Sequence, residues 1–137
     1  MPMDERHVVT CFLEHGGKIM ILRRSGRVGT YRGRWAGVSG YIEEGTSAPE
    51  QAWTEIREEC GVDSDDVELV REGQPLEVVD SDLGRKWIVH PFRFRVVRPD
   101  KVRIDWEHTE AKWVVPDDIG RHETVPKLLE AWRRVAG

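Results

Sequence analysis

Three glutamates at helical spacing are the feature that most constrains this chain. Glu55, Glu58 and Glu59 lie within the segment 40–62, which reads GYIEEGTSAPEQAWTEIREECGV. Residues three and four positions apart share one face of a helix, so this spacing brings together three carboxylates that repel each other. A divalent cation turns that repulsion into coordination, and hard carboxylate oxygens suit Mg²⁺, or Mn²⁺ as its substitute. The pattern therefore predicts a metal site on a helix, of a type that handles phosphate.

The local sequence also predicts where this helix begins and ends. Ser47 and Glu50 have the spacing of a capping box, in which the two residues satisfy each other's free backbone N–H groups. Gly61 is suited to end the helix in a left-handed conformation. The three glutamates would point outward, and the opposite face would pack on the core with Ala52, Ile56 and Cys60.

Segments rich in β-branched and aromatic residues predict strands between turn signals. They lie at 7–14, 18–24, 67–71, 76–79, 87–97 and 111–115, with a short extended piece at 103–106 and a long loop at 25–45. Thr124 would cap a final helix whose hydrophobic face carries Leu128, Leu129, Trp132 and Val135. Helices and strands interspersed in one chain predict an α/β fold with a mixed sheet covered on both sides.

Length and composition favour one domain spanning residues 1–137. The net charge of −4 argues against a nonspecific nucleic-acid binder. No hydrophobic run approaches membrane-spanning length, and the opening MPMDERH is too polar for a signal peptide, so a cytoplasmic protein is expected. Two cysteines, Cys11 and Cys60, fit reduced and buried thiols.

The segment 40–62 resembles the Nudix box, a long motif in fixed register. That motif is a glycine, five residues, a glutamate, seven residues, and then Arg-Glu-aliphatic-x-Glu-Glu-x-Gly-aliphatic. The matching positions are Gly40, Glu55, Ile56, Glu58, Glu59, Gly61 and Val62. Trp35 before the motif, and Glu107 followed by Trp113 after it, agree with the family too, so the resemblance extends from His7 to Val135.

The resemblance implies roles for the acids of the motif. Glu58 and Glu59 would coordinate the metal directly, and Ser39 would offer its backbone carbonyl as a further ligand. Glu55 would either join them through a second ion or act as a base on the attacking water.

A further acid outside the motif is implied as well. Some members of the family supply a metal ligand or base from a loop shortly before a strand tryptophan. Glu107 precedes Trp113 in that way, and Glu110 is the alternative. His108 lies beside both acids, but a lone loop histidine is expected at the surface.

Two positions depart from the motif. Thr46 replaces its first glutamate and Thr54 replaces its arginine. In the family these two residues are thought to form an ion pair that braces the loop against the helix. Losing one partner would leave a charge uncompensated, whereas losing both can be nearly neutral, so two threonines form a coherent replacement.

A run of arginines precedes the motif. Arg23, Arg24, Arg27, Arg32 and Arg34 create a local positive field in an acidic chain, and such a field can receive a diphosphate. Of these, Arg23, Arg27, Arg32 and Arg34 are predicted to bind substrate. Tyr31 is predicted to stack on a base or another ring of the substrate.

The resemblance implies an α/β/α sandwich and a Mg²⁺-dependent pyrophosphohydrolase that cleaves a nucleoside diphosphate linked to another moiety. Nucleoside triphosphates, ADP-ribose-like compounds and nucleotide sugars all stay open as substrates. One alternative is a Nudix domain that senses a nucleotide without turnover, although the intact glutamates argue against it. Another is hydrolysis at the 5′ end of an RNA, which the net acidity disfavours. Many relatives are dimers, so a homodimer is compatible with the resemblance.

Overall fold

Two long parallel strands form the centre of the sheet in this computed structural model, which describes residues 3–137. β1 (Asp4–His15) and β7 (Arg85–Val96) pair from Asp4 opposite Arg85 to Glu14 opposite Arg95. The other pairings between strands in the described range are antiparallel, so the sheet is mixed as predicted. They involve β2 (Lys18–Arg24), β3 (Trp35–Ala36), β4 (Val38–Tyr41), β5 (Val67–Glu72), β6 (Leu76–Asp80) and β8 (His108–Val114).

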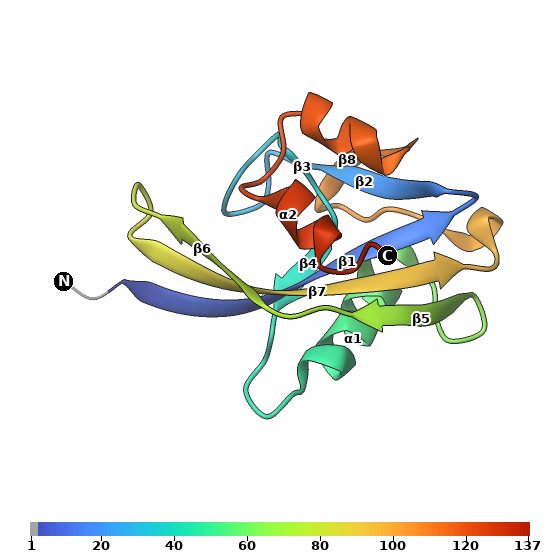
Figure 1. Ribbon diagram of the computed structural model, residues 1–137, viewed down its shortest axis with the longest axis horizontal. Helices are drawn as coiled ribbons and strands as arrows, with labels where there is room; N and C mark the ends of the chain where they lie inside the picture. The colour runs from blue at the N-terminus through green and yellow to red at the C-terminus, as the bar shows by residue number, and fades with distance from the viewer. Residues whose placement is uncertain (1–2) are drawn as a thin grey trace.

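Helices cover both faces of this sheet (Figure 1). α1 (Ala48–Cys60) packs on one face, where Ala52, Ile56 and Cys60 join a core with residues of β1 and β7. α2 (Leu128–Arg133) lies on the other face beside the 3₁₀ helix η2 (Pro116–Arg121). A second 3₁₀ helix, η1 (Pro99–Lys101), follows β7. The predicted α/β/α sandwich is therefore confirmed.

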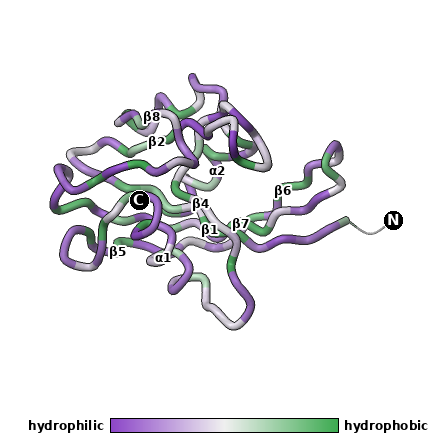
Figure 2. The backbone as a smooth tube through the Cα atoms, turned by 180° about the vertical axis from the view of Figure 1, so that it is seen from behind, coloured by the Kyte–Doolittle hydropathy of each residue, from purple (hydrophilic) through white to green (hydrophobic). Residues whose placement is uncertain are grey.

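The N-terminal half of β1 projects from this body together with β6 and the start of β7 (Figure 1). Figure 2 shows that this end of β1 is hydrophilic and that the chain becomes hydrophobic where it enters the body. The exposed stretch begins at Asp4, and the buried stretch runs from Val9 to Leu13. Within residues 3–137, no helix combines the length and hydrophobicity of a membrane span.

The ends of α1 agree with the sequence prediction. The Ser47 hydroxyl accepts a hydrogen bond from the Glu50 backbone N–H at 3.2 Å, and the Glu50 side chain accepts one from the Ser47 backbone N–H at 3.2 Å. Gly61 ends the helix with φ 70° and ψ 22°, a conformation that costs glycine little because it has no Cβ. The capping box and the C-terminal glycine therefore set the length of the helix that carries the acids.

Two predictions of local structure were wrong. The expected loop at 25–45 contains the short strands β3 and β4, whose pairing depends on distant strands. Thr124 does not cap α2, because its hydroxyl donates to the Val125 carbonyl and Lys127 occupies the cap position with φ 60°. The segment 103–106, predicted as a short extended piece, lies outside the named strands and contacts the end of α1 through a bond from the Arg103 N–H to the Cys60 carbonyl.

A half-buried ion pair attaches the C-terminal segment to the sheet. Arg93 on β7 lies 2.7 Å from the Glu14 carboxylate on β1, and their side chains are 16% and 14% exposed. Arg93 also donates to the carbonyls of Val135 and Gly137. Its guanidinium lies 5.3 Å from the centre of the Trp132 ring. One arginine thus joins β1, β7 and the end of α2.

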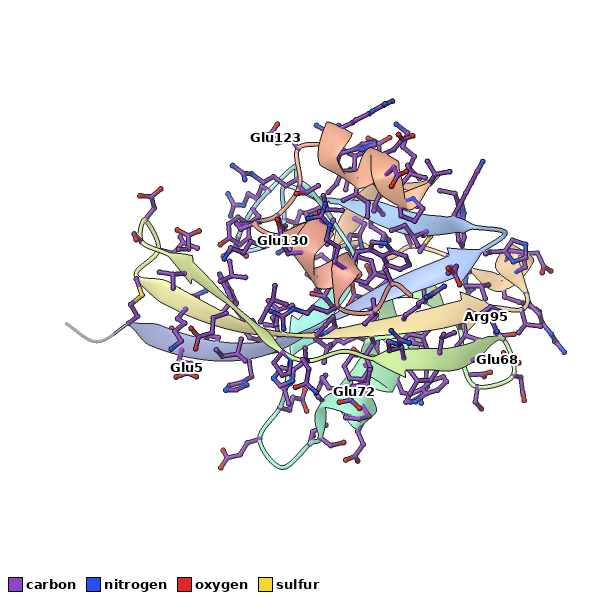
Figure 3. The ribbon with its side chains drawn as sticks, in the orientation of Figure 1. Glu5, Glu68, Glu72, Arg95, Glu123 and Glu130 are labelled. Carbon is purple, nitrogen blue, oxygen red and sulfur yellow. The ribbon has the colours of Figure 1, made fainter. Side chains whose placement is uncertain are left out.

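We expect Arg93→Met to lower the free energy of unfolding by about 3–5 kcal/mol, because the Glu14 carboxylate loses its ion-pair partner at a site with little access to water. The matched control is Arg95→Met, since Arg95 lies 3.5 Å from Glu68 in a pair that is more than half exposed (Figure 3). That control should cost less than about 1 kcal/mol. Urea unfolding measures the free energy of unfolding of both variants. An equal decrease in the two would show that the pair of Arg93 and Glu14 stabilises the protein no more than the exposed pair does.

Candidate active site

Glu55 lies against the backbone of β4. A Cβ at Gly40 would overlap the Glu55 carboxylate, so only glycine lets the acid approach the strand this closely. Gly40 pairs with Val9 in the antiparallel ladder between β4 and β1, which holds the strand in place. The spacing of the motif therefore has a steric reason, since the glycine makes room for an acid fifteen residues later in the chain.

Glu59 is buried, with 3% of its surface exposed, which corrects the prediction that all three glutamates point outward. The segment before β8 covers the last turn of α1, where the Arg103 N–H bonds to the Cys60 carbonyl at 2.9 Å. Glu58, in contrast, is exposed on the same helix. Helical periodicity gives the face of a residue, but a covering segment from elsewhere in the chain decides whether that face is buried.

Burial, contact with Glu55 and the negative charges of Glu107 and Asp105 together raise the pKa of Glu59 to about 11, and burial is the largest of these causes. Burial also raises the pKa of Glu107, assisted by the charges of Asp105 and Glu55. These carboxyls cannot all ionise side by side at neutral pH without a compensating positive charge. Their arrangement is that of an electrostatic site for a cation.

His108 lies at the start of β8 and is 7% exposed, so the expectation of a surface histidine was wrong. Its Nε2 atom is 3.7 Å from Glu59 Oε1, and its Nδ1 atom is 3.4 Å from Asp105 Oδ1. Ligand atoms of Glu59, Asp105 and His108 lie within 4.8 Å of one another. Sequence reasoning passed over Asp105, for which the spacing Asp-x-x-His was the available signal.

The residues at this site fit a divalent metal ion. Glu59 Oε2 is buried and has no hydrogen-bond partner among the described residues. An unpaired buried carboxylate oxygen is unfavourable, and it is a suitable ligand for a hard cation. The predicted ligand Ser39 is half-buried beside the site, with its hydroxyl donating to the Gly37 carbonyl at 3.3 Å.

A cavity of about 280 Å³ opens beside these acids, between the sheet and the segments 29–31 and 125–128. Glu107, Ser39 and Gly40 line one part of it, and Tyr31, Trp87 and Val8 line another. Glu110, the alternative acid outside the motif, is exposed and lies 3.3 Å from Arg23 instead. The structure thus places Glu107, and not Glu110, at the cavity.

The aromatic part of the cavity is held by a short hydrogen-bond chain. The Tyr31 hydroxyl donates to Asp80 at 2.6 Å and accepts from Trp87 Nε1 at 3.0 Å. Burial and the bond to Asp80 raise the pKa of Tyr31 to about 12, so its hydroxyl stays protonated. Tyr41 stacks on Trp87 with ring centres 6.0 Å apart. Rings fixed in this way form a preorganised apolar surface.

The predicted arginines lie mainly outside this cavity. Arg23 donates to the Gly33 carbonyl, Arg32 to the Val28 carbonyl, and Arg34 to the Thr124 carbonyl. Arg27 lies over the exposed Trp106 ring at 5.4 Å. Arg24 lines the cavity instead, half-buried, with its Nε donating to the Thr30 carbonyl at 2.9 Å. The substrate roles of the other four stay predictions.

A buried glutamine connects the loop after β4 to the acids of α1. Gln51 is 3% exposed, its side-chain carbonyl accepts from the Glu43 N–H at 3.1 Å, and its amide donates to Glu55 Oε1 at 2.9 Å. This contact joins the loop to the helix, the task that the motif's ion pair is thought to perform. Sequence reasoning missed Gln51, since a glutamine inside an amphipathic helix carries no distinctive signal.

A mixed sheet between helices, with carboxylates at the edge of a cavity, defines a fold and site suited to metal-assisted phosphate chemistry. The family model described as "NUDIX domain" matches residues 3–134, and the chain belongs to that family. It is accordingly a hydrolase of the class that acts on phosphoric anhydride bonds.

Solved structures of other proteins have the same fold. The MutT protein of Methanosarcina mazei Go1 has a TM-score of 0.81 at 23% identity, with 98% of this chain and 95% of that chain covered. A C. elegans Ap4A hydrolase has a TM-score of 0.74 at 16% identity, with 96% and 93% covered. The E. coli ORF135 protein has a TM-score of 0.71 at 23% identity, with 96% and 90% covered. At these identities the likeness concerns the fold.

We expect Gln51→Leu to lower the free energy of unfolding by about 0.5–1.5 kcal/mol, because the Glu43 N–H and Glu55 Oε1 each lose a hydrogen-bond partner. Metal affinity should fall as well, since Glu55 loses its support. Gln74→Leu, at an exposed position, is the matched control and should change neither quantity. Thermal unfolding and metal titration are the measurements, and an unchanged metal affinity would show that Gln51 does not position Glu55.

The two threonines of the motif are predicted to act as a pair. Thr46→Glu alone should lower stability or activity, and adding Thr54→Arg should restore it, with a coupling free energy of about 1 kcal/mol. A double-mutant cycle, read by thermal unfolding and by turnover, measures this coupling. Strict additivity of the two changes would show that the positions do not interact.

Proposed function

We propose that this protein is a Mg²⁺-dependent pyrophosphohydrolase that cleaves a nucleoside diphosphate linked to another moiety, with Mn²⁺ as a substitute for Mg²⁺. The observation that carries the proposal is one continuous cavity that joins Glu107 and Gly40 to the aromatic pair Tyr31 and Trp87. A charged diphosphate and an attached ring require such a combination of surfaces. We further propose that one domain performs this reaction, in the cytoplasm, where the free buried thiols of Cys11 and Cys60 stay reduced.

The motif acids would hold the metal. Glu59 and Glu55, which contact each other, would donate ligands, and Glu58 and the Ser39 backbone carbonyl would complete the set. When bound, the cation neutralises charge on the diphosphate and lowers the pKa of a coordinated water. The other contributions come from residues that position the substrate and move a proton.

Glu107 is the proposed general base. It lines the cavity, and burial raises its pKa toward the range in which a carboxylate accepts a proton efficiently at neutral pH. Arg24 lines the same cavity and would place its guanidinium against a phosphate oxygen, since arginine stays charged even when half-buried. Lys127 adds a second cationic side chain to the lining.

The apolar part of the cavity would take the base or another ring of the substrate. Tyr31 and Trp87 are fixed by their mutual hydrogen bond, and Val8 and Val89 add an apolar floor from β1 and β7. Stacking on such a surface tolerates several ring systems, so the chemistry favours a nucleotide-like substrate class over one particular base.

The test is a panel of nucleoside triphosphates, dinucleotides, ADP-ribose and nucleotide sugars, each with Mg²⁺ and with chelator. We expect metal-dependent hydrolysis of one class, a loss of about 10²–10⁴-fold in kcat for Glu107→Gln, and a large loss for Glu59→Gln and Glu58→Gln. Glu123→Gln, whose side chain is 80% exposed, is the control and should keep full activity.

The same panel distinguishes turnover from sensing. Nucleotide and metal binding without hydrolysis of any compound would overturn the enzyme proposal in favour of a nucleotide sensor. Equal rates in the wild type and in Glu59→Gln would overturn the metal-ligand assignment. A 5′-triphosphorylated RNA is tested beside the panel, and hydrolysis confined to its 5′ end would move the substrate class to nucleic acid.

A further inference from the structure

Neither ring nitrogen of His108 makes a close hydrogen bond to another described residue. Its Nε2 atom is 3.7 Å from Glu59 Oε1 and its Nδ1 atom is 3.4 Å from Asp105 Oδ1, both longer than a good N–H···O hydrogen bond. Glu59 Oε2 and His108 Nδ1 are buried without hydrogen-bond partners among the described residues. The side chains of Glu59 and His108 are 3% and 2% exposed, so water has little access to satisfy them.

The surrounding charges favour a cation at this point. Asp105, Glu55 and Glu107 all raise the pKa of Glu59 through their negative charges. Arg24 is the cationic side chain that opposes them, and its guanidinium is engaged with Thr30. Two buried polar atoms without hydrogen-bond partners among the described residues, beside acids and one histidine, form a donor set that suits a cation.

We propose that His108 Nε2 is a direct ligand of the cation held by Glu59, and that Asp105 orients the imidazole through Nδ1. The inference rests on the metal centre of the proposed function and extends it. A centre with nitrogen and oxygen donors binds Mn²⁺, Co²⁺ and Zn²⁺ more tightly than Mg²⁺, because imidazole suits transition metals and Mg²⁺ prefers oxygen.

The geometry accommodates a shared ion. Donors that bind one metal at about 2.0–2.2 Å are separated by roughly 3–3.5 Å, close to the distance between Glu59 Oε1 and His108 Nε2. A proton on Nδ1, facing Asp105, leaves the lone pair of Nε2 directed toward Glu59. This order, carboxylate then histidine then metal, is a common way to orient a ligating imidazole.

The competing interpretation is that His108 only braces Glu59 as a hydrogen-bond donor. In that case the metal would have oxygen ligands alone, and its preference would follow Mg²⁺ and Mn²⁺ chemistry. The two interpretations differ in an observable other than activity, namely whether bound Co²⁺ gives an imidazole N–H proton the large through-bond contact shift that direct coordination produces.

The experiment is a Co²⁺ titration followed by proton NMR in water, on tag-free protein carrying His90→Asn. That background is needed because Nδ1 of His7 and Nε2 of His90 lie 3.0 Å apart at the surface and could bind Co²⁺ themselves. We expect one strongly shifted, exchangeable imidazole N–H resonance at saturating Co²⁺. It should vanish in His108→Gln and persist in His122→Gln, a matched change at a histidine outside the cluster.

Affinities complete the test. Co²⁺ and Zn²⁺ should bind about 10–100-fold more weakly to Asp105→Asn than to the parent, with a smaller change for Mg²⁺. Asp105→Asn also serves if His108→Gln fails to fold. Tight Co²⁺ binding without a shifted imidazole proton overturns this inference and leaves the hydrolase proposal intact. Absence of any Co²⁺, Mn²⁺ or Mg²⁺ binding overturns both.

Discussion

The rest of the site depends on carboxylates crowded where water has little access. Glu59 is nearly fully buried and lies beside Glu55. Burial, together with Glu55 and the charges of Glu107 and Asp105, raises the pKa of Glu59 to about 11. Desolvation and like charge both disfavour ionised carboxylates, and a cation reverses both effects. The acids therefore form a site suited to a cation, and the fold brings together the acids of α1 and those of the segment before β8.

A close approach at a glycine and a few hydrogen bonds hold this cluster of carboxylates in place. Gly40 omits a side chain so that Glu55 can approach β4, and Gln51 connects Glu55 to the loop that leaves the same strand. The bond from Arg103 to the Cys60 carbonyl draws the segment before β8 over the last turn of α1. The contact between Arg103 and Cys60 joins segments far apart in sequence, and the other two join α1 to the neighbouring strand and loop. In this chain the neutral amide of Gln51 joins the loop to α1, and Thr46 and Thr54 occupy the two positions at which the motif has an ion pair.

The cavity explains how one site can serve a charged and an apolar part of a substrate. Glu107 and Arg24 provide charge beside the metal ligands, and Tyr31 and Trp87 provide a rigid apolar surface. The loop that carries Tyr31 and the segment before α2 close over the sheet to form the walls. Neither segment has regular structure for most of its length, which is usual for parts of a fold that determine specificity.

The sequence predicted the helix that carries the glutamates and the family of the chain, because both depend on local chemistry and on a fixed spacing of residues. The ends of the helix followed from the capping box at Ser47 and from Gly61. The register of Gly40 with the motif glutamates indicated the family and a site suited to a cation. Only the tertiary structure decided which acids are buried and that His108 and Asp105 lie beside Glu59. It also decided that Arg24, and none of the four arginines predicted to bind substrate, lines the cavity. Periodicity specifies the direction of a side chain from its own helix or strand, but burial and proximity depend on which distant segment packs over it.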